Sequence, residues 1–439
     1  MATRRWLGTA KNVTEIKTIT IASTWATGDT LTVTINNIEA TITIGSLTTT
    51  AQVATTLYQA WTGTTLTDTT ASCSPTIADG GFQSIPEFYE LNPSSPGASV
   101  VTFTCRTSGK PVTWSVSETT AGSGTATGAT GTAATGKNFF SNQDNWSGNT
   151  VPVDGDDIVF DSGEVDCKYD LSPAIQPGTV TITQGYTGRI GLAAINADDS
   201  ARKYYEYRTQ YLTFDSNAST CTYKIGQGDG QGSRRIKIDA GAGQSTVVVY
   251  NTGARNESDF PTFLFTGTHA SNTFTIFNGD AGIAFVAGET ATIATLRCGG
   301  DATSSAKLIV GSGATLTTVV VTGLGTLQLN SNCTTLTQTG ATVEYYAGSP
   351  ATATIWSGTL RYLSTSTIGT GCTIGGAGLL DRSSETRAAT ITPKISMYKG
   401  ARLLDPNGTL TLTGGWQAVG CQDADIVTSL GYNRSYTVT

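Results

Sequence analysis

Charged residues, prolines and histidines are scarce in this sequence. Asp, Glu, Lys and Arg together make up 13% of the 439 residues, proline occurs 12 times, and His269 is the single histidine. The net charge is −7, and the clustered lysines and arginines that contact phosphate groups are missing. This scarcity excludes a typical nucleic-acid-binding protein, so we expect no nucleic-acid partner.

Zinc sites and nucleophilic active sites also lack their usual residues. Eight cysteines are scattered without a Cys-x-x-Cys pair, which argues against zinc. We expect buried free thiols, with a Cys73–Cys105 disulfide as the alternative. No Gly-x-Ser-x-Gly elbow accompanies His269, and Gly226–Gly232 lacks the Lys-Ser/Thr that completes a phosphate loop. The sequence therefore predicts no catalytic residue, no metal ligand and no cofactor.

Long apolar runs are absent as well. The segment 1–12 carries two arginines but no apolar core of the kind found in signal peptides. No later stretch approaches the roughly 20 apolar residues that a membrane helix needs. We expect a chain that folds in a cytoplasm and has no membrane partner.

Glycine, threonine and β-branched residues are abundant instead. The 51 glycines separate short runs in which apolar residues alternate with threonine. β-branched residues favour strands and glycine favours tight turns, whereas strong helix formers are few. The composition predicts an all-β-dominated protein that is long enough for two or three domains.

A loose Gly-x-Leu-x-Leu pattern recurs in the last third of the chain. Three of its starts are separated by 376 − 358 = 18 and 400 − 376 = 24 residues, about one coil of a parallel β-solenoid. One coil cannot bury its apolar row, but stacked coils can. We therefore predict a parallel β-helix with an apolar interior and a Thr/Ser/Asn exterior. The segments are Gly325–Leu329, Gly358–Leu363, Gly376–Asp381 and Gly400–Asp405.

A small β-rich module is expected before the solenoid. Residues 1–120 contain strongly alternating segments and a hairpin turned by Asn36-Asn37. Residues 49–61 form the one convincing helical pattern, with a threonine at the N-cap and an apolar stripe. We interpret this module as an anchor.

A linker and a capped solenoid complete the predicted organisation. Residues 121–136 contain only Gly, Ala, Ser and Thr, which predicts a linker, with an extended segment that lies against a neighbour as the alternative. Residues 137–439 predict the β-solenoid. We expect Phe139, Phe140 and Trp146 to plug its N-terminal end, where the first coil would otherwise expose its core.

Acidic residues gather between Asp154 and Asp166. They surround a predicted turn that precedes an Ile-Val-Phe strand, and Asp is a common turn former. We expect a structural role for them, with a calcium loop and a glycosidase carboxylate pair as the alternatives.

The most unusual polar stretch covers residues 202–211, where four tyrosines interleave with three cations. Tyr and Arg combine rigid contact area with polar tips, which is typical of protein–protein hot spots. The alternatives are a strand whose tyrosines cover the solenoid flank, and a platform that binds a glycan. The candidate interface residues are Tyr204, Tyr205, Tyr207, Arg208 and Tyr211.

Two stretches resemble bacteriophage structural proteins. Trp25, the Gly28-Asp29-Thr30 segment and the Asn36-Asn37 turn are similar to the small β-rich modules of phage virion proteins. The run from Asn145 to Phe160 is similar to the first coil of β-helical phage and bacterial surface proteins. The whole chain thus resembles phage-associated structural proteins at the level of architecture.

The resemblance implies a function as well as a fold. It implies a non-enzymatic capsid decoration or cement protein of a virion, which is assembled in the host cytoplasm and binds the major capsid protein or another virion protein. It also implies a homotrimer. The alternative is a tail fibre or tailspike that binds or cleaves host surface polysaccharide, which predicts an Asp/Glu pair about 5–9 Å apart in a groove.

Overall fold

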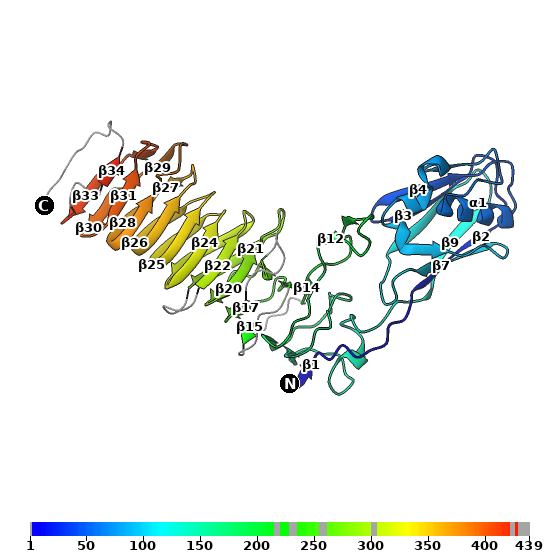
Figure 1. Cartoon of the computed structure of the whole chain (residues 1–439), viewed down its shortest axis with the longest axis horizontal. Coiled ribbons are helices and arrows are strands. Elements are labelled where there is room, and N and C mark those ends of the chain that lie inside the picture. The colour runs from blue at the N-terminus through cyan, green and yellow to red at the C-terminus, as the bar shows by residue number, and fades with distance from the viewer. Residues whose placement is uncertain are drawn as a thin grey trace.

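The structure is a long β-solenoid with a separate β-rich module beside its N-terminal end (Figure 1). It is a computed structural model that describes residues 2–214, 220–227, 235–253, 261–299, 305–421 and 426–428. The all-β-dominated fold, with a β module followed by a parallel β-helix, is confirmed.

The solenoid consists of one 21-stranded sheet in which the paired strands run parallel. Its strands are β1 (Thr3–Arg5), β10 (Asp157–Phe160), β11 (Thr179–Thr183), β14 (Leu212–Thr213), β15 (Cys221–Gln227), β16 (Ile236–Asp239), β17 (Ser245–Val249), β18 (Phe263–Thr266), β19 (Thr273–Ile276), β20 (Gly279–Ile283), β21 (Ala291–Cys298), β22 (Ser305–Val310), β23 (Ala314–Val321), β24 (Leu324–Leu329), β25 (Cys333–Tyr345), β26 (Pro350–Tyr362), β28 (Gly371–Asp381), β30 (Ile395–Tyr398), β31 (Arg402–Asp405), β33 (Trp416–Val419) and β34 (Ile426–Thr428). A small parallel sheet of β27 (Thr367–Ile368), β29 (Ala389–Ile391) and β32 (Leu410–Leu412) flanks the last coils.

The Gly-x-Leu-x-Leu segments do belong to stacked coils, but the coils differ in length. Leu327, Val343, Leu360, Leu380 and Leu403 are successive register partners with buried side chains. The coils therefore span 343 − 327 = 16, 360 − 343 = 17, 380 − 360 = 20 and 403 − 380 = 23 residues. The coil through Val343 was missed from the sequence because Val343 and Tyr345 replace the two leucines and Gly340 lies one position further from them.

Threonine forms a column on the outside of the solenoid. Because each inward residue of a strand is followed by an outward one, the coil register also aligns the outward side chains. All members of the column are half-buried by their neighbours above and below. In register they are Thr179, Thr222, Thr246, Thr273, Thr295, Thr318, Thr335 and Thr352.

The module contains two antiparallel four-stranded sheets and one α-helix. One sheet has the order β6 (Leu91–Pro93), β7 (Val100–Cys105), β2 (Ile16–Ala22) and β9 (Thr125–Thr132). The other has the order β5 (Ser72–Ser74), β4 (Ile38–Thr43), β3 (Thr30–Ile35) and β8 (Trp114–Thr119). The short 3₁₀ turns are η1 (Ile77–Asp79), η2 (Phe82–Ser84) and η3 (Phe88–Glu90), with η4 (Gln143–Asn145) in the solenoid cap.

Helix α1 (Thr50–Thr62) occurs where the sequence predicts it. Thr49 and Gln52 form a reciprocal capping box, and Gly63 ends the helix in the left-handed conformation. The helix buries Leu57 and Trp61 against the module core, where the Trp61 ring lies 4.5 Å from that of Phe103.

The predicted linker is wrong for half of its length, where the residues instead form the alternative, an extended segment that pairs with a neighbour. Residues 125–132 are strand β9, which pairs along β2. Small residues serve close packing here. A Cβ on Gly124, which precedes β9, would lie 2.7 Å from the Trp25 indole, and one on Gly128 would lie 2.7 Å from the Val116 side chain. Larger residues would push the strand away from the core.

The predicted module boundary at residue 1 is also wrong. Strand β1 pairs in parallel with β10, so the chain begins in the solenoid, leaves it to form the module, and returns (Figure 1). The module is thus inserted into the first coil. Val13 pairs with Thr135 where the two connecting segments run side by side.

Aromatic residues close the N-terminal end of the solenoid. Phe140 and Trp146 are fully buried, and Trp6 contacts Trp146 edge to face at 5.1 Å. The backbone of Leu7 donates to Asn145, and that of Ser147 donates to Arg5, so this segment covers β1. At the other end Trp416 is buried, and most of the tail after Gly420 lies outside the described residues.

Candidate functional site: the junction between module and solenoid

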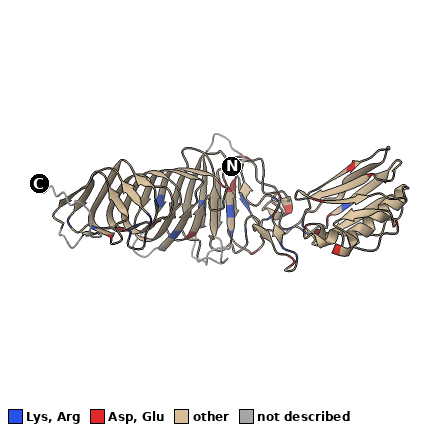
Figure 2. Cartoon of the chain, turned by 90° about the horizontal axis from the view of Figure 1, so that it is seen from above, with Lys and Arg blue, Asp and Glu red and all other residues tan. Residues whose placement is uncertain are grey.

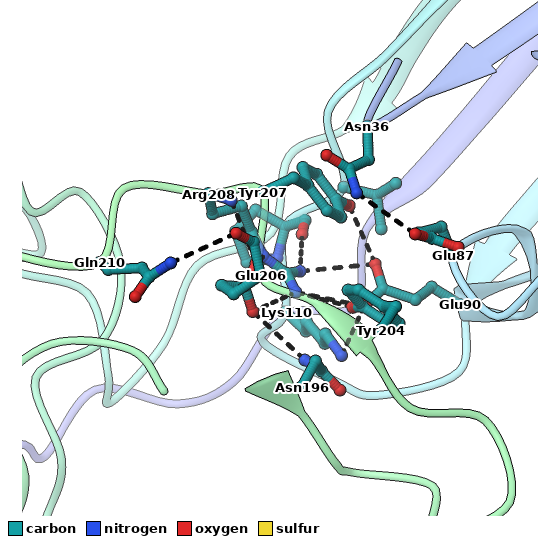
Figure 3. Close-up of polar contacts among 12 residues, drawn as sticks. Asn36, Glu87, Glu90, Lys110, Asn196, Tyr204, Glu206, Tyr207, Arg208 and Gln210 are labelled. Carbon is teal, nitrogen blue, oxygen red and sulfur yellow. Dashed lines mark hydrogen bonds and ion pairs between the residues drawn. The ribbon is translucent and has the colours of Figure 1, made fainter. Parts of the chain in front are cut away.

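The predicted interface segment lies where the module meets the solenoid (Figure 3). A short antiparallel hairpin, formed by β12 (Ile195–Asn196) and β13 (Tyr204–Tyr205), precedes Glu206, Tyr207 and Arg208. Tyr207 and Arg208 contact Glu90 of the module, which also pairs with Lys110. We call this cluster of buried polar groups the junction.

Arg208 connects the two parts of the chain. Its Nε donates to Glu206 Oε1 at 2.6 Å, and its Nη2 lies 3.2 Å from Glu90 Oε1. Its Nη1 donates to the carbonyl oxygen of Pro111 in the module at 2.9 Å. The planar guanidinium suits this set of acceptors because its donors point in fixed directions.

Glu90 is the shared acceptor on the module side. Tyr204 donates to its Oε1, and Tyr207 donates to its Oε2 at 3.1 Å. Lys110 Nζ lies 2.5 Å from the same carboxylate and 2.7 Å from Asp198 of the solenoid side. The side chains of Glu90 and Lys110 are only 6% and 3% exposed, so both charges depend on these partners.

Aromatic contacts accompany the ion pairs. Tyr207 packs against the hydrophobic core of the module. At the edge of the junction, two arginines contact the Tyr89 ring, with the Arg106 guanidinium 4.1 Å and the Arg202 guanidinium 3.8 Å from its centroid. Since Arg202 comes from the solenoid side, this cation–π contact also crosses the junction.

The environment of the junction favours charged acids and neutral tyrosines. Burial tends to raise the pKa of Glu206, but hydrogen bonds and the charge of Arg208 outweigh it and hold that pKa below its ordinary value. The pKa of Asp198 also lies below its ordinary value, because the hydrogen bond and the charge of Lys110 outweigh the effect of burial. Burial and the negative charge of Glu90 raise the pKa values of Tyr204 and Tyr207. The two phenols therefore act as neutral donors.

The buried ion pairs of the junction fix the position of the module relative to the solenoid more than they add to the net folding stability. Desolvation of buried charges offsets much of their attraction, yet removing one partner leaves another charge buried and costs about 3–5 kcal/mol. The directional contacts on Glu90 are satisfied only when the module sits in this position. The junction therefore holds the module in one orientation relative to the solenoid.

The structure separates the five predicted interface residues. Tyr204, Tyr207 and Arg208 contact the chain's own module. Tyr205 is 78% exposed. Tyr211 lines a different cleft on the solenoid, where its ring lies 5.2 Å from the Lys237 ammonium.

Glu90, Lys110 and Asp198 were missed by the sequence analysis. Glu90 could have been identified as a buried charge that needs a partner, because it is the single charge between the apolar residues Phe88 and Leu91 in a chain that has few charges. Its partners could not be identified, because they lie about 20 and more than 100 positions away.

The acidic segment Asp154–Asp166 has structural partners. Asp156 accepts from the backbone of Ala2 at 2.8 Å and pairs with Arg4, which lower its pKa against the effect of burial. Asp157 accepts from Thr179 at 2.6 Å, and Asp154 accepts from the backbone of Gln176 at 2.9 Å. These contacts join β1, the cap and the next coil, as a structural role requires.

The cysteines and the possible metal ligands form no functional site in the described residues. Cys73 and Cys105 are buried thiols that form no disulfide with each other, and burial raises the pKa of the Cys105 thiol to about 11. Within the described ranges, no cluster of three or more His, Cys, Asp or Glu side chains could hold a metal ion. The described chain has no helix long and apolar enough to cross a membrane. Most of the glycine-rich segment Gly226–Gly232 lies outside the described residues.

Two clefts border the junction. The larger, of about 590 Å³, includes Pro111, Phe140, Tyr169 and Arg208 in its lining. The smaller, of about 400 Å³, lies beside Tyr89.

Comparison with known proteins found no match among protein families, curated proteins or solved structures.

Proposed function

We propose that this chain is a non-enzymatic structural protein of a virus particle, specifically a capsid decoration or cement protein. The observation that carries the proposal is the buried junction between module and solenoid. A body with two surfaces in fixed relation can contact two neighbouring subunits of a shell at once. Because such binding requires the assembled shell, it would stabilise the shell by mass action.

The surface of the solenoid supports a scaffold. Its ribbon carries only isolated charged positions (Figure 2), and threonine fills one outward column over eight strands. Such a face offers hydroxyl groups and methyl groups without a concentrated charge. The partner in this proposal is the major capsid protein or another virion protein, and the assembled form is a homotrimer.

Quantitative mass spectrometry of purified particles tests this proposal. The copy number of this chain is measured against the most abundant shell protein. A decoration protein is expected at a ratio near that of the shell protein. A ratio of a few per cent would instead indicate a tail fibre or spike, and absence from particles would overturn the virion proposal.

A specific observation favours the tailspike alternative. A cleft of about 450 Å³ on the solenoid contains two carboxylates, Asp239 and Glu289, together with Tyr211. Glu289 accepts from the backbone of Val286 at 2.9 Å, and Asp239 accepts from that of Gly241. Release of sugar fragments from host surface polysaccharide, lost in Glu289→Gln, would support cleavage. The decoration proposal expects no release from either protein.

A further inference from the structure

Exposed aromatic side chains line one corner of the solenoid. Tyr250 follows β17 and Phe277 follows β19, and their rings stack at 6.0 Å with an interplanar angle of 29°. Further along, Trp356 of β26 and Tyr398 of β30 stack with the same distance and angle. All four side chains are between 37% and 46% exposed.

The coil register places these four rings on one line. Each follows the last inward residue before the corner, and these inward residues are Val249, Ile276, Ile355 and Met397. Val419, 43% exposed, continues the line because it is the register partner of Tyr398. We call this line, from Tyr250 to Val419, the aromatic ridge.

The ridge is built into the solenoid. A Cβ on Gly375 would lie 2.4 Å from Cε3 and Cζ3 of Trp356, so the indole lies against the coil between Trp356 and Tyr398. A side chain that is already held in place loses little conformational entropy when it is covered. All seven tryptophans are described, and Trp356 is the most exposed of them.

Few charges interrupt this surface. The outward positions just before the corner are Val248, Thr275, Arg297, Val320, Thr337, Thr354, Thr373, Ser396 and Gln417, with one charge among them. Among the described positions just after the corner, Lys399 is charged. Interface cores are depleted of charge and enriched in Tyr, Trp and Phe, as this strip is.

The geometry points to a second copy of this chain as the partner of the ridge. From β17 to β33 the ridge crosses eight strand spacings, about 38 Å in length. A partner that covers it must extend parallel to the solenoid axis over that length. Another solenoid does so, and a cyclic assembly about an axis parallel to the solenoids would bring each ridge against the same ridge of its neighbour.

The length of the ridge allows a stable assembly. A contact six residues wide, about 20 Å across, would cover about 760 Å² per chain over a length of about 38 Å. A standard stable interface buries roughly 800 Å² on each partner. This inference does not depend on the proposed virion role, because self-association is measured on the purified chain alone.

Sedimentation and light scattering of the full chain test the inference. We expect a mass that is a multiple of 45.5 kDa for the natural sequence and the monomer mass for Trp356→Gln/Tyr398→Gln. Tyr205→Gln, at an exposed tyrosine far from the ridge, is the matched control and should keep the assembly. A monomeric natural chain at ~100 µM, a concentration at which micromolar complexes are formed, would overturn the inference. An assembled mass that is unchanged in the double variant would also overturn the inference.

Cysteine cross-linking tests the parallel arrangement. In a Cys421→Ser background, Thr322→Cys lies near the middle of the ridge and Tyr250→Cys lies at its end. A parallel assembly predicts disulfide-linked dimers from both variants, whereas dimers from Thr322→Cys alone would show antiparallel packing and contradict it. Melting and circular dichroism establish that each variant folds. Monomers retained on immobilised polysaccharide through Trp356 would show a glycan as the partner and would also overturn the inference.

Discussion

The module and the solenoid bury their apolar residues in different ways. In the module, α1 and two antiparallel sheets surround one core in which Trp61 contacts Phe82, Phe88 and Phe103. In the solenoid, each inward side chain packs mainly on its register partners in the coils above and below. A defect in the module should therefore spread through a whole domain, whereas a defect in the solenoid should stay near its coil.

Trp61→Ala is expected to have the largest effect. Truncating a fully buried tryptophan costs about 3–5 kcal/mol, because the cavity removes contacts on all sides. Hydrogen exchange should then rise throughout the module while the solenoid strands from β17 onward keep their protection. Trp356→Ala, at an exposed position, is the control. Loss of protection in both regions would show that they unfold as one unit.

Glu90→Gln should separate the two regions without unfolding either. The substitution leaves Lys110 and Arg208 without their common carboxylate, at a cost of about 3 kcal/mol. We expect a larger radius of gyration in X-ray scattering and faster exchange in residues 195–208. Glu118→Gln removes an exposed acid from the same module and should change neither quantity.

Gly124→Ala tests the packing of β9. The new Cβ would lie 2.7 Å from the Trp25 indole, and overpacking of this kind costs about 1–3 kcal/mol. Urea unfolding of the module should shift to lower concentration. Gly97→Ala has open space around its Cβ and should be close to neutral. Equal stability of the two variants would contradict the role assigned to small residues in β9.

Acid should loosen the junction by a smaller amount. The pKa values of Glu206 and Asp198 are lowered in the folded chain, so their contribution is present above the ordinary carboxyl pKa and is lost as the pH falls through the folded values. Exchange in residues 195–208 should thus rise below about pH 4. Glu206→Gln should make the exchange rate depend less on pH. An unchanged pH profile in this variant would count against a role of Glu206 in the acid response.

The parts of the fold that could be predicted are those with a local signal. The capping box of Thr49 and Gln52 defines α1, and the Asn36-Asn37 turn has positive φ at both residues, as a two-residue hairpin requires. The pairing of β9 with β2 could not be predicted, because its small residues are explained only by their position beside Trp25 and Val116. The partners at the junction are likewise distant in sequence, and no local pattern links Glu90 to Arg208.

The most direct test of the central claim is a distance distribution between module and solenoid. Spin labels at Ser94→Cys and Thr187→Cys, both exposed, in a Cys421→Ser background report the relative placement of the two regions. We predict one narrow distance at neutral pH, which broadens when Glu90→Gln is added. A broad distribution in the protein with Glu90 intact would contradict the claim that the junction holds module and solenoid as one body.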